Sequence, residues 1–265
     1  MKLSVVIPDY KDPLLLPTVN SILETSELGD QLEVIAIHDG VDPVVTLPND
    51  PRVVSLRLEK NGGMRRAINA GVKIAKGEFL MRADEHCMFG QGFDRIMTET
   101  CQPDWIVTAI RYFLDTEKWE VMDKKPVGYE RLLIQGEEVK KFTGQPWRER
   151  DNERKDIMID ETMAMQGSCW VMPHAWWDKV IGELQTEGYG PAYQDSHEMI
   201  FKTWKAGGKM MLNKNTWFAH KYRTFARTHQ EGTKDNPWIR NQSWQYCIDV
   251  WKDYYDKEIK PKWNL

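Results

Sequence analysis

The sequence contains little cysteine and no long apolar run. Its four cysteines are widely spaced among 265 residues and include no Cys-x-x-Cys pair, so neither a disulfide framework nor a structural zinc site is indicated. No stretch approaches the ~18 consecutive apolar residues that a membrane span requires, and the apolar run LSVVIP is too short for a signal peptide. We therefore expect a cytoplasmic protein with reduced thiols and no membrane span.

The sequence also lacks an excess of basic residues. Lysine and arginine total 36 against 40 aspartates and glutamates, and this balance excludes a protein that coats nucleic acid non-specifically. The charges are uneven, however, because the segment 199–230 contains no acidic residue and seven lysines or arginines. That segment can face an anionic partner, or its basic residues can simply form a solvated surface.

Short apolar strands alternate with helical patterns through the first ~90 residues. The predicted strands are 3–7, 33–37, 53–58 and 79–82, and the helices between them are 15–23 and 64–75. This order is typical of an α/β protein with a parallel sheet covered by helices. Farther along, the patterns predict helices at 196–206 and 241–255, with strands at 209–212 and 217–219. The segment 117–160 is charged and weakly periodic, and we expect long loops there.

Three aspartates, Asp9, Asp39 and Asp84, each stand just beyond a predicted strand. Because ligands of parallel sheets bind at the carboxyl ends of the strands, the pattern predicts that these side chains line one edge where a nucleotide can lie. The simpler interpretation is that Asp39 only forms a turn with Gly40 and that Asp9 only caps the next helix.

A histidine follows the third of these aspartates at a spacing that suits a metal. Asp84 and His86 lie two residues apart, so an extended backbone places both on one side while Glu85 points away. Both can therefore reach one divalent cation, and His220, after a later predicted strand, can supply a third ligand. The alternative for each histidine is a purely structural hydrogen bond.

The segment Asn61-Gly62-Gly63 precedes a predicted helix with Arg65 and Arg66 in its first turns. Free amide groups, the positive end of the helix dipole and guanidinium charge would together suit a diphosphate. A loop with two glycines is a weak signal by itself.

These motifs, in this order, resemble a glycosyltransferase of the GT-A fold in the family-2-like group, and most closely the catalytic domain of the polypeptide N-acetylgalactosaminyltransferases. LSVVIPDY, EVIAIHDG and NGGMRRAINAGVKIAKGEFL resemble the first strands and second helix of that domain. Asp84-Glu85-His86-Cys87 fits its D-x-H variant of the metal motif, and His220-Lys221-Tyr222-Arg223 fits its H-x-F-R ending.

The resemblance implies a single GT-A catalytic domain over residues 1–265. Its Rossmann-like, mostly parallel central sheet would be flanked by helices, with a small subsheet on the acceptor side. Residues 1–115 would form the half that binds the nucleotide sugar, residues 116–230 the acceptor-binding half, and residues 231–265 a C-terminal loop and helix. Residues 224–236 correspond to a loop that closes over the donor in the family.

The resemblance also implies a metal-dependent transfer of sugar from a nucleotide sugar, expected to be a UDP-sugar, to a hydroxyl acceptor. Mixed carboxylate and imidazole ligation suits Mn²⁺, with Mg²⁺ as the alternative ion. The expected metal ligands are Asp84, His86 and His220. The expected donor-binding residues are Pro8, Asp9, Tyr10, Asp39, Gly63, Arg66, Asp84 and Arg223. The expected catalytic residues are Asp195, Glu198 and Arg223.

Two departures from the family bear on the reaction. Asp195 stands where the family has glutamate, and Ala192-Tyr193-Gln194 stands where it has W-G-G. Asp195 can cap its helix or contact the acceptor. Retention of anomeric configuration is the family's outcome and is favoured here, but aspartate at this position leaves inversion open.

The acceptor is not defined by the sequence. A saccharide, a protein hydroxyl and hydroxymethyl-pyrimidine DNA are all compatible with it, the last because of a basic cluster and 12 tryptophans. The cluster comprises Lys140, Lys141, Arg148, Arg150, Arg154 and Lys155. Trp204, Trp217 and Trp251 can equally be core residues. Functions of another class are an inactive nucleotide-sugar-binding module and a nucleotidyltransferase, although IPDYKDP stands where the latter has a glycine-rich loop.

Overall fold

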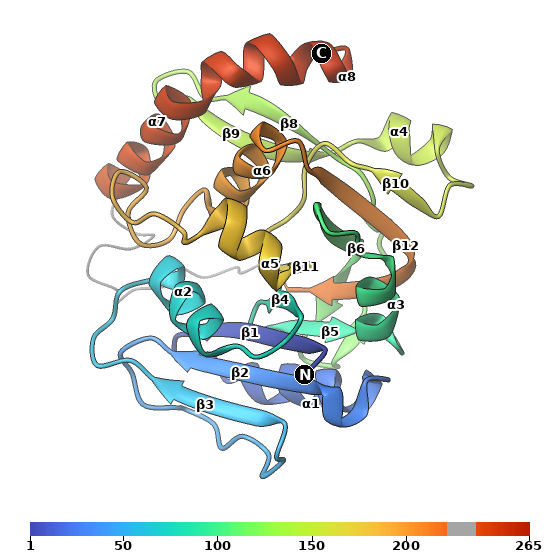
Figure 1. Ribbon diagram of the computed structural model, residues 1–265, viewed down its shortest axis with the longest axis vertical. Coiled ribbons are helices and arrows are strands. Elements are labelled where there is room, and N and C mark those ends of the chain that lie inside the picture. Colours follow the sequence, from blue (N-terminus) through green and yellow to red (C-terminus); the bar gives the residue numbers. More distant parts are fainter. Residues whose placement is uncertain (222–236) are drawn as a thin grey trace.

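Four parallel strands at the N-terminal end of the chain form one half of the central sheet (Figure 1). The computed structural model describes residues 1–221 and 237–265. The strands are β1 (Leu3–Asp9), β2 (Leu32–His38), β3 (Val53–Arg57) and β4 (Phe79–Ala83). β1 pairs in parallel with β2 and β4, and β2 pairs in parallel with β3. All four strands predicted from the apolar runs are confirmed.

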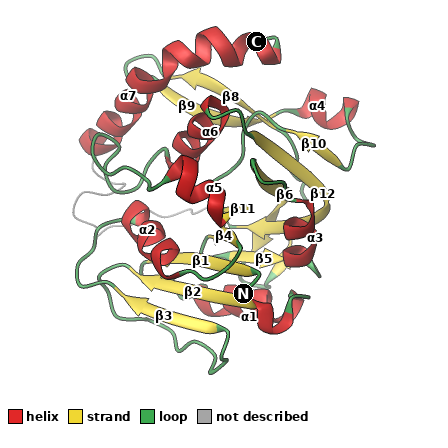
Figure 2. Cartoon of the chain, viewed as in Figure 1, coloured by secondary structure: helices red, strands yellow, loops and turns green. Residues whose placement is uncertain are grey.

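Helices cover both faces of this half, as Figure 2 shows. On one face α1 (Leu15–Thr25) shares an apolar cluster with Val5 and Ile7, and on the other α2 (Met64–Ile74) packs on Val6. α3 (Phe93–Thr100) belongs to the same cluster as α1 and lies against β12, β6 and β11, the strands of the second half of the sheet that are described below. Successive strand residues point to opposite faces, so a strand buried on both sides must be apolar throughout. This explains the near-continuous run LSVVIP. A short turn, η1 (Gly29–Gln31), leads into β2.

The sheet continues into the second half of the chain, in the order β10-β12-β6-β11-β4-β1-β2-β3. β11 (Cys169–Pro173) is antiparallel to both of its neighbours, β4 and β6 (Trp105–Asp115). β12 (Lys209–His220) runs parallel to β6, and the longest ladders of the sheet are therefore parallel. Three short strands complete it: β5 (Cys87–Phe89), β7 (Glu120–Val121) and β10 (Ile159–Glu161).

β12 contains an irregularity that matters for the site. Asn213 pairs with Ala109 and Trp217 with Ile110, so β12 advances four residues while β6 advances one. Beyond this bulge the ladder resumes, and His220 pairs with Phe113 on one side and Cys87 of β5 on the other. The two strands that were predicted at 209–212 and 217–219 are thus one strand interrupted by a bulge.

The segment 117–160 is more ordered than expected. It contains the hairpin β8 (Glu130–Gln135) and β9 (Lys141–Pro146), which forms a separate two-stranded sheet, and α4 (Arg148–Glu153). The expectation of long loops is therefore wrong, whereas the small subsheet implied by the family is present. Phe142 on β9 packs edge-on against Phe201 and Tyr255, and this burial orders the hairpin.

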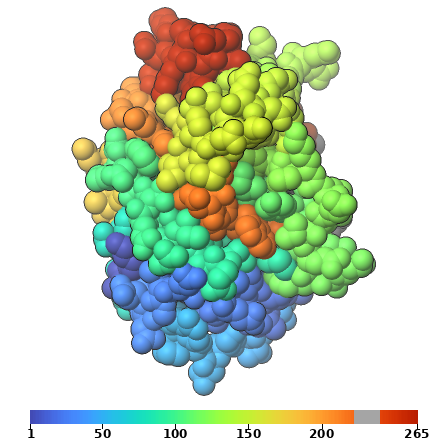
Figure 3. Space-filling model, turned by 90° about the vertical axis from the view of Figure 1, so that its right-hand side faces the viewer, coloured from blue at the N-terminus to red at the C-terminus, as the bar shows by residue number. Residues whose placement is uncertain are grey.

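The remaining helices cover the hairpin end of the molecule. α5 (His174–Trp176) continues into η2 (Trp177–Ile181), and α6 (Asp195–Lys205) precedes β12. α7 (Pro237–Tyr254), η3 (Tyr255–Ile259) and α8 (Lys260–Trp263) end the chain, at the end of the molecule opposite β1–β3 in Figures 1 and 3. Trp251 stacks on Phe201 and is buried, as is Trp204, while Trp217 is half-buried. Within residues 1–221 and 237–265, no helix combines the length and apolarity needed to cross a membrane.

Candidate active site

The residues that follow the parallel strands line one cavity of about 530 Å³. Asp9 ends β1, Asp39 follows β2 and Asp84 follows β4, and all three residues line this space. Pro8 and Tyr10, beside Asp9, line it as well. The structure therefore brings together the three aspartates at one sheet edge, as the alternation of strands and helices predicts.

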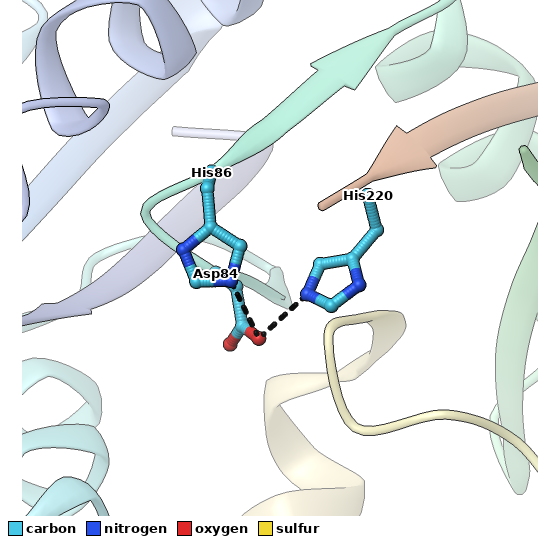
Figure 4. Close-up of side chains that lie close together, drawn as sticks. All are labelled: Asp84, His86 and His220. Carbon is cyan, nitrogen blue, oxygen red and sulfur yellow. Dashed lines mark hydrogen bonds and ion pairs between the residues drawn. The ribbon is translucent and has the colours of Figure 1, made fainter. Parts of the chain in front are cut away.

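Asp84, His86 and His220 meet at one wall of the cavity (Figure 4). Oδ2 of Asp84 lies 3.2 Å from Nε2 of His220 and 3.9 Å from Nε2 of His86. One ligand atom from each of the three residues lies within 4.8 Å of the other two. Pairing of β5 with β12 produces this meeting, because it sets His220 opposite the residue that follows His86.

The protonation states suit a divalent cation. Burial lowers the pKa of His220 to about 4, so its imidazole is neutral at pH 7 and has a lone pair to offer. Burial opposes ionisation of Asp84, but Arg82 and the neighbouring imidazoles outweigh it and hold the pKa of Asp84 well below its usual range. An ionised carboxylate oxygen and a neutral imidazole nitrogen are ligands that Mn²⁺ and related ions accept.

A second carboxylate faces the other nitrogen of His86. Nδ1 of His86 lies 3.2 Å from Oδ2 of Asp12 and 3.8 Å from Oε2 of Glu85. Asp12 also accepts the amide N–H of Leu14, as its place before α1 suggests. A carboxylate at Nδ1 fixes the tautomer that leaves Nε2 toward Asp84, which is the usual support of a metal-ligating histidine.

The start of α6 forms another part of the cavity lining. Asp195 is the first residue of α6 and lines the cavity, and its carboxylate forms an ion pair with Arg82. Glu198, one turn later, does not face the cavity. It is fully buried and pairs with Arg65, and Lys202 lies 2.8 Å from its Oε1. The carboxylate of Glu198 is therefore engaged within the fold and is not available to a substrate in the cavity.

The glycine segment before α2 has a different role from the expected one. The amide N–H groups of Gly62 and Gly63 donate to the two carboxylate oxygens of Asp39 at 2.8 and 2.7 Å. Asn61 Nδ2 donates to the same carboxylate at 2.9 Å. The expectation that these amides are free for a diphosphate is wrong, because Asp39 already accepts them. Burial raises the pKa of Asp39 despite these bonds.

The two arginines of α2 face different surroundings. Arg65 is fully buried and donates to the backbone oxygens of Gln185 and Tyr193 as well as to Glu198, so it is not available to a ligand. Arg66 is exposed and lines a neighbouring hollow of about 580 Å³ rather than the cavity itself. Arg223 and the loop 224–236 lie outside the described residues.

Two residues that shape the cavity were not among the expected site residues. Arg82, inside β4, contacts both Asp84 and Asp195, and its position within an apolar strand was the only signal for it. His38, at the end of β2, places Nδ1 2.7 Å from Oδ2 of Asp9, and both side chains are buried. His38 thus fixes the carboxylate of Asp9 at the cavity edge.

The architecture matches a glycosyltransferase of the GT-A fold. The crystal structure of GalNAc-T7 with UDP, GalNAc and Mn²⁺ has a TM-score of 0.75 to this chain, covering 98% of this chain and 50% of that chain. Sequence identity is 17%, so the likeness shows the fold alone. It confirms the expected mostly parallel central sheet flanked by helices.

The chain belongs to glycosyl transferase family 2, whose family model matches residues 4–172. Polypeptide N-acetylgalactosaminyltransferase 4 of Mus musculus is 27% identical over 279 residues, covering 97% of this chain and 44% of the relative. Polypeptide N-acetylgalactosaminyltransferase 5 of Caenorhabditis elegans is 26% identical over 93% of this chain and 41% of the relative. The uncharacterized glycosyltransferase YwdF of Bacillus subtilis (strain 168) is 35% identical over 96 residues, or 35% of each chain. The chain thus spans less than half the length of the two N-acetylgalactosaminyltransferases.

Proposed function

We propose that this protein transfers a sugar from a UDP-sugar to a hydroxyl acceptor and requires Mn²⁺, with Mg²⁺ as the second ion to test. The observation that carries the proposal is the meeting of Asp84, His86 and His220 at the wall of a cavity that strand ends line. The structure of GalNAc-T7 was solved with UDP, GalNAc and Mn²⁺, which agrees with this choice of donor and ion.

We assign the three residues of that cluster as the metal ligands. When bound there, Mn²⁺ would act as a Lewis acid that neutralises charge on the leaving diphosphate. The donor set fits the ion, since it combines an ionised carboxylate with imidazole nitrogens, and Asp12 supports His86 from the opposite side of the ring.

We assign the lining residues at and just after the ends of β1 and β2 to the nucleoside. Pro8, Asp9 and Tyr10 would contact it, and Asp39 would hydrogen-bond to the uracil through lone pairs that its amide partners leave over. Asp9 is suited to this because His38 holds its carboxylate in one orientation. We assign Gly63 an indirect role in binding the donor. Its amide N–H donates to Asp39 and orients that carboxylate, and it does not contact the ligand itself.

Arginine side chains are proposed for the diphosphate. Arg66 lies near Asp39 and is exposed, so its long side chain is free to turn toward a bound donor. Arg223 is assigned to the diphosphate from its match to the family motif. A guanidinium presents a planar fork of donors to phosphate oxygens, and lysine does not.

In this proposal different parts of the chain bind the donor and the acceptor. Residues 1–115 would bind the nucleotide sugar and residues 116–230 the acceptor, and residues 231–265 would form the C-terminal loop and helix of a single catalytic domain. Asp195 is the acceptor-side residue that lines the cavity, and it would orient the acceptor hydroxyl or the sugar. We propose retention of configuration, as the resemblance implies, and the anomeric proton coupling of the product by NMR would test it.

A DNA acceptor gains no support from the described residues. Arg150 and Arg154, which were candidates for contacts with a polyanion, both pair with Asp160, and Arg148 donates to the backbone oxygen of Pro126. Lys202 likewise donates to backbone oxygens of Ile181 and Glu183. Much of this basic charge therefore forms ion pairs and hydrogen bonds within the fold. The proposed acceptor remains a hydroxyl compound, with no preference for DNA.

The test is a screen of UDP-sugars for hydrolysis and transfer, each with Mn²⁺, with Mg²⁺ and with a chelator. We expect release of UDP from at least one UDP-sugar with Mn²⁺ and none with the chelator. The control is Asp253→Asn, which removes an exposed surface carboxylate far along α7 and should leave the rate unchanged. Equal UDP release with and without a divalent ion would overturn the proposal, and so would a failure of every UDP-sugar to bind.

A further inference from the structure

An arginine stands inside β4, one of the inner strands of the central sheet. Arg82 is the fourth residue of β4, whose other members are apolar, and it lies between β11 and β1 in the sheet. Its side chain is 4% exposed. Burying a guanidinium away from water costs several kcal/mol unless carboxylates or other acceptors surround it, so the partners of Arg82 explain why it is there.

Arg82 contacts two carboxylates with two different nitrogens. Nη2 donates to Oδ1 of Asp84 at 2.7 Å, and Nη1 donates to Oδ2 of Asp195. Asp84 directly follows the strand that carries Arg82, whereas Asp195 begins α6 far along the chain. One rigid guanidinium therefore joins the proposed metal cluster to the acceptor-side aspartate.

The contact with Asp84 orients that carboxylate. Oδ1 faces Arg82, and Oδ2 faces the imidazoles of His220 and His86. Because the carboxylate is planar, fixing Oδ1 on the arginine fixes the direction of Oδ2 as well. A lysine at position 82 would present a single ammonium group and could not hold both carboxylates in this geometry.

The backbone near Asp195 is arranged for the same contact. Gln194, just before it, has a φ of 57°, in the left-handed region that non-glycine residues seldom occupy. Gly167 lies beside the ion pair, and a Cβ atom there would come within 3.1 Å of both Arg82 Nη1 and Asp195 Oδ2. The absence of a side chain at Gly167 therefore leaves room for this pair.

We propose that Arg82 is a positioning residue that couples the Asp84–His86–His220 cluster to Asp195. The proposal rests on the proposed function, and it adds that the orientation of a metal ligand and of the acceptor-side carboxylate depend on one another. Removing one carboxylate frees an arm of Arg82 and strengthens its hold on the other. Replacing Asp195 should therefore draw Arg82 toward Asp84. The guanidinium would then hold the Asp84 carboxylate more tightly, and a divalent cation would bind to that carboxylate more weakly.

The test is a double-mutant cycle read by Mn²⁺ binding, measured by calorimetry on the full chain. We expect Asp195→Asn to weaken Mn²⁺ binding about tenfold when Arg82 is present, and less than twofold in the Arg82→Met background. A direct charge effect of Asp195 on the cation would be the same in both backgrounds. Equal weakening with and without Arg82 would therefore overturn the proposal.

Two further variants keep the test decisive. If Arg82→Met does not fold, Arg82→Lys takes its place, and the effect of Asp195→Asn should again fall below twofold because one ammonium cannot bridge both carboxylates. Arg95→Met is the matched control, since Arg95 also contacts two carboxylates, of Glu27 and Glu99, on the exposed surface of α3. It should leave the effect of Asp195→Asn at about tenfold.

The two proposals fail in different ways. If the wild-type protein binds no divalent cation, the proposed function is wrong. If the wild-type protein binds Mn²⁺ and Asp84→Asn does not, but Asp195→Asn acts equally with and without Arg82, only the coupling through Arg82 is wrong.

Discussion

The guanidinium of Arg65 and the carboxylate of Glu198 form an ion pair in which neither side chain is exposed, and the pair joins α2 to α6. Arg65 also lies over the ring of Tyr189 at 4.2 Å, so one side chain links α2, α6 and the segment that carries Tyr189. Glu198 lies one helical turn after Asp195 but does not line the cavity. Through its pair with Arg65 it stabilises the packing of α6 against α2.

Replacing Glu198 by alanine should destabilise the fold by about 3–5 kcal/mol, because it leaves the guanidinium of Arg65 buried without its carboxylate. Urea unfolding followed by circular dichroism would measure this. Glu187→Ala, at an exposed glutamate, is the control and should change stability by less than about 0.5 kcal/mol. If both variants unfold at the same urea concentration, the ion pair does not support α6.

Replacing a member of the metal cluster should abolish cation binding without unfolding the protein. We expect Asp84→Asn and His220→Ala each to weaken Mn²⁺ binding by at least about 100-fold, since each removes a ligand outright. Calorimetric titration with Mn²⁺ measures the affinity, and the melting temperature reports the fold. His174→Ala, at a histidine on α5 away from the cluster, should bind Mn²⁺ normally. Normal binding by His220→Ala would remove His220 from the site.

Adding a side chain at Gly63 should disturb the loop that orients Asp39. Gly63 has a φ of 83°, and a Cβ there would lie 2.3 Å from Cβ of Pro191 and 2.5 Å from its backbone oxygen. We expect Gly63→Ala to cost about 2–5 kcal/mol, as the sum of backbone strain and the clash. Gly29→Ala separates the two causes, because Gly29 also has a positive φ of 55° but nothing lies within 4 Å. If both variants lose the same stability, the clash with Pro191 is relieved in Gly63→Ala and only the backbone strain remains.

Acid should weaken the anchoring of α4 through Asp160. Burial opposes ionisation of Asp160, but bonds from Arg154 and Tyr129 outweigh it and lower its pKa to about 2. The folded pKa lies below the unfolded value of about 3.9, so this carboxylate stabilises the fold above about pH 4 and loses that effect as pH falls toward 2. Asp160→Asn should cost about 1–3 kcal/mol at pH 7.

Melting temperatures of wild type and Asp160→Asn, recorded at pH 7, 5, 4 and 3, would check this pH dependence. The difference between the two proteins should stay constant from pH 7 to 5 and shrink below pH 4. A difference that persists unchanged at pH 3 would mean that the hydrogen bonds, and not the charge, carry the effect.

The parallel half of the fold could be predicted because its signal is local. Strands buried on both faces need continuous apolar runs, and Leu3–Asp9 and Leu32–His38 provide them, each followed at once by a carboxylate or a turn. The hairpin of β8 and β9 was missed because its strands mix buried residues such as Leu132 with half-exposed polar ones. Its order comes from packing on Phe201 and Tyr255, which no local pattern reveals.

The site was predictable only in part. The spacing of Asp84 and His86 suggests that both reach one cation. His220 is 136 residues from Asp84, so its place after a predicted strand made it only a candidate, and the family resemblance supplied the stronger link. The use of the Gly62 and Gly63 amides by Asp39 was not foreseen, because sequence alone does not show which acceptor a loop amide finds. Arg82 was overlooked because its two partners lie in different segments.

The bulge in β12 limits how this chain can vary. Three residues between Asn213 and Trp217 have no partner in the β6 ladder, and His220 follows only three positions after Trp217. Because neighbouring strand residues face opposite sides, deleting or inserting one codon between the bulge and His220 would turn the imidazole away from Asp84. A gap of one residue in a homologue at this point would thus mark a chain without the proposed third ligand, even where Asp84, Glu85 and His86 are all kept.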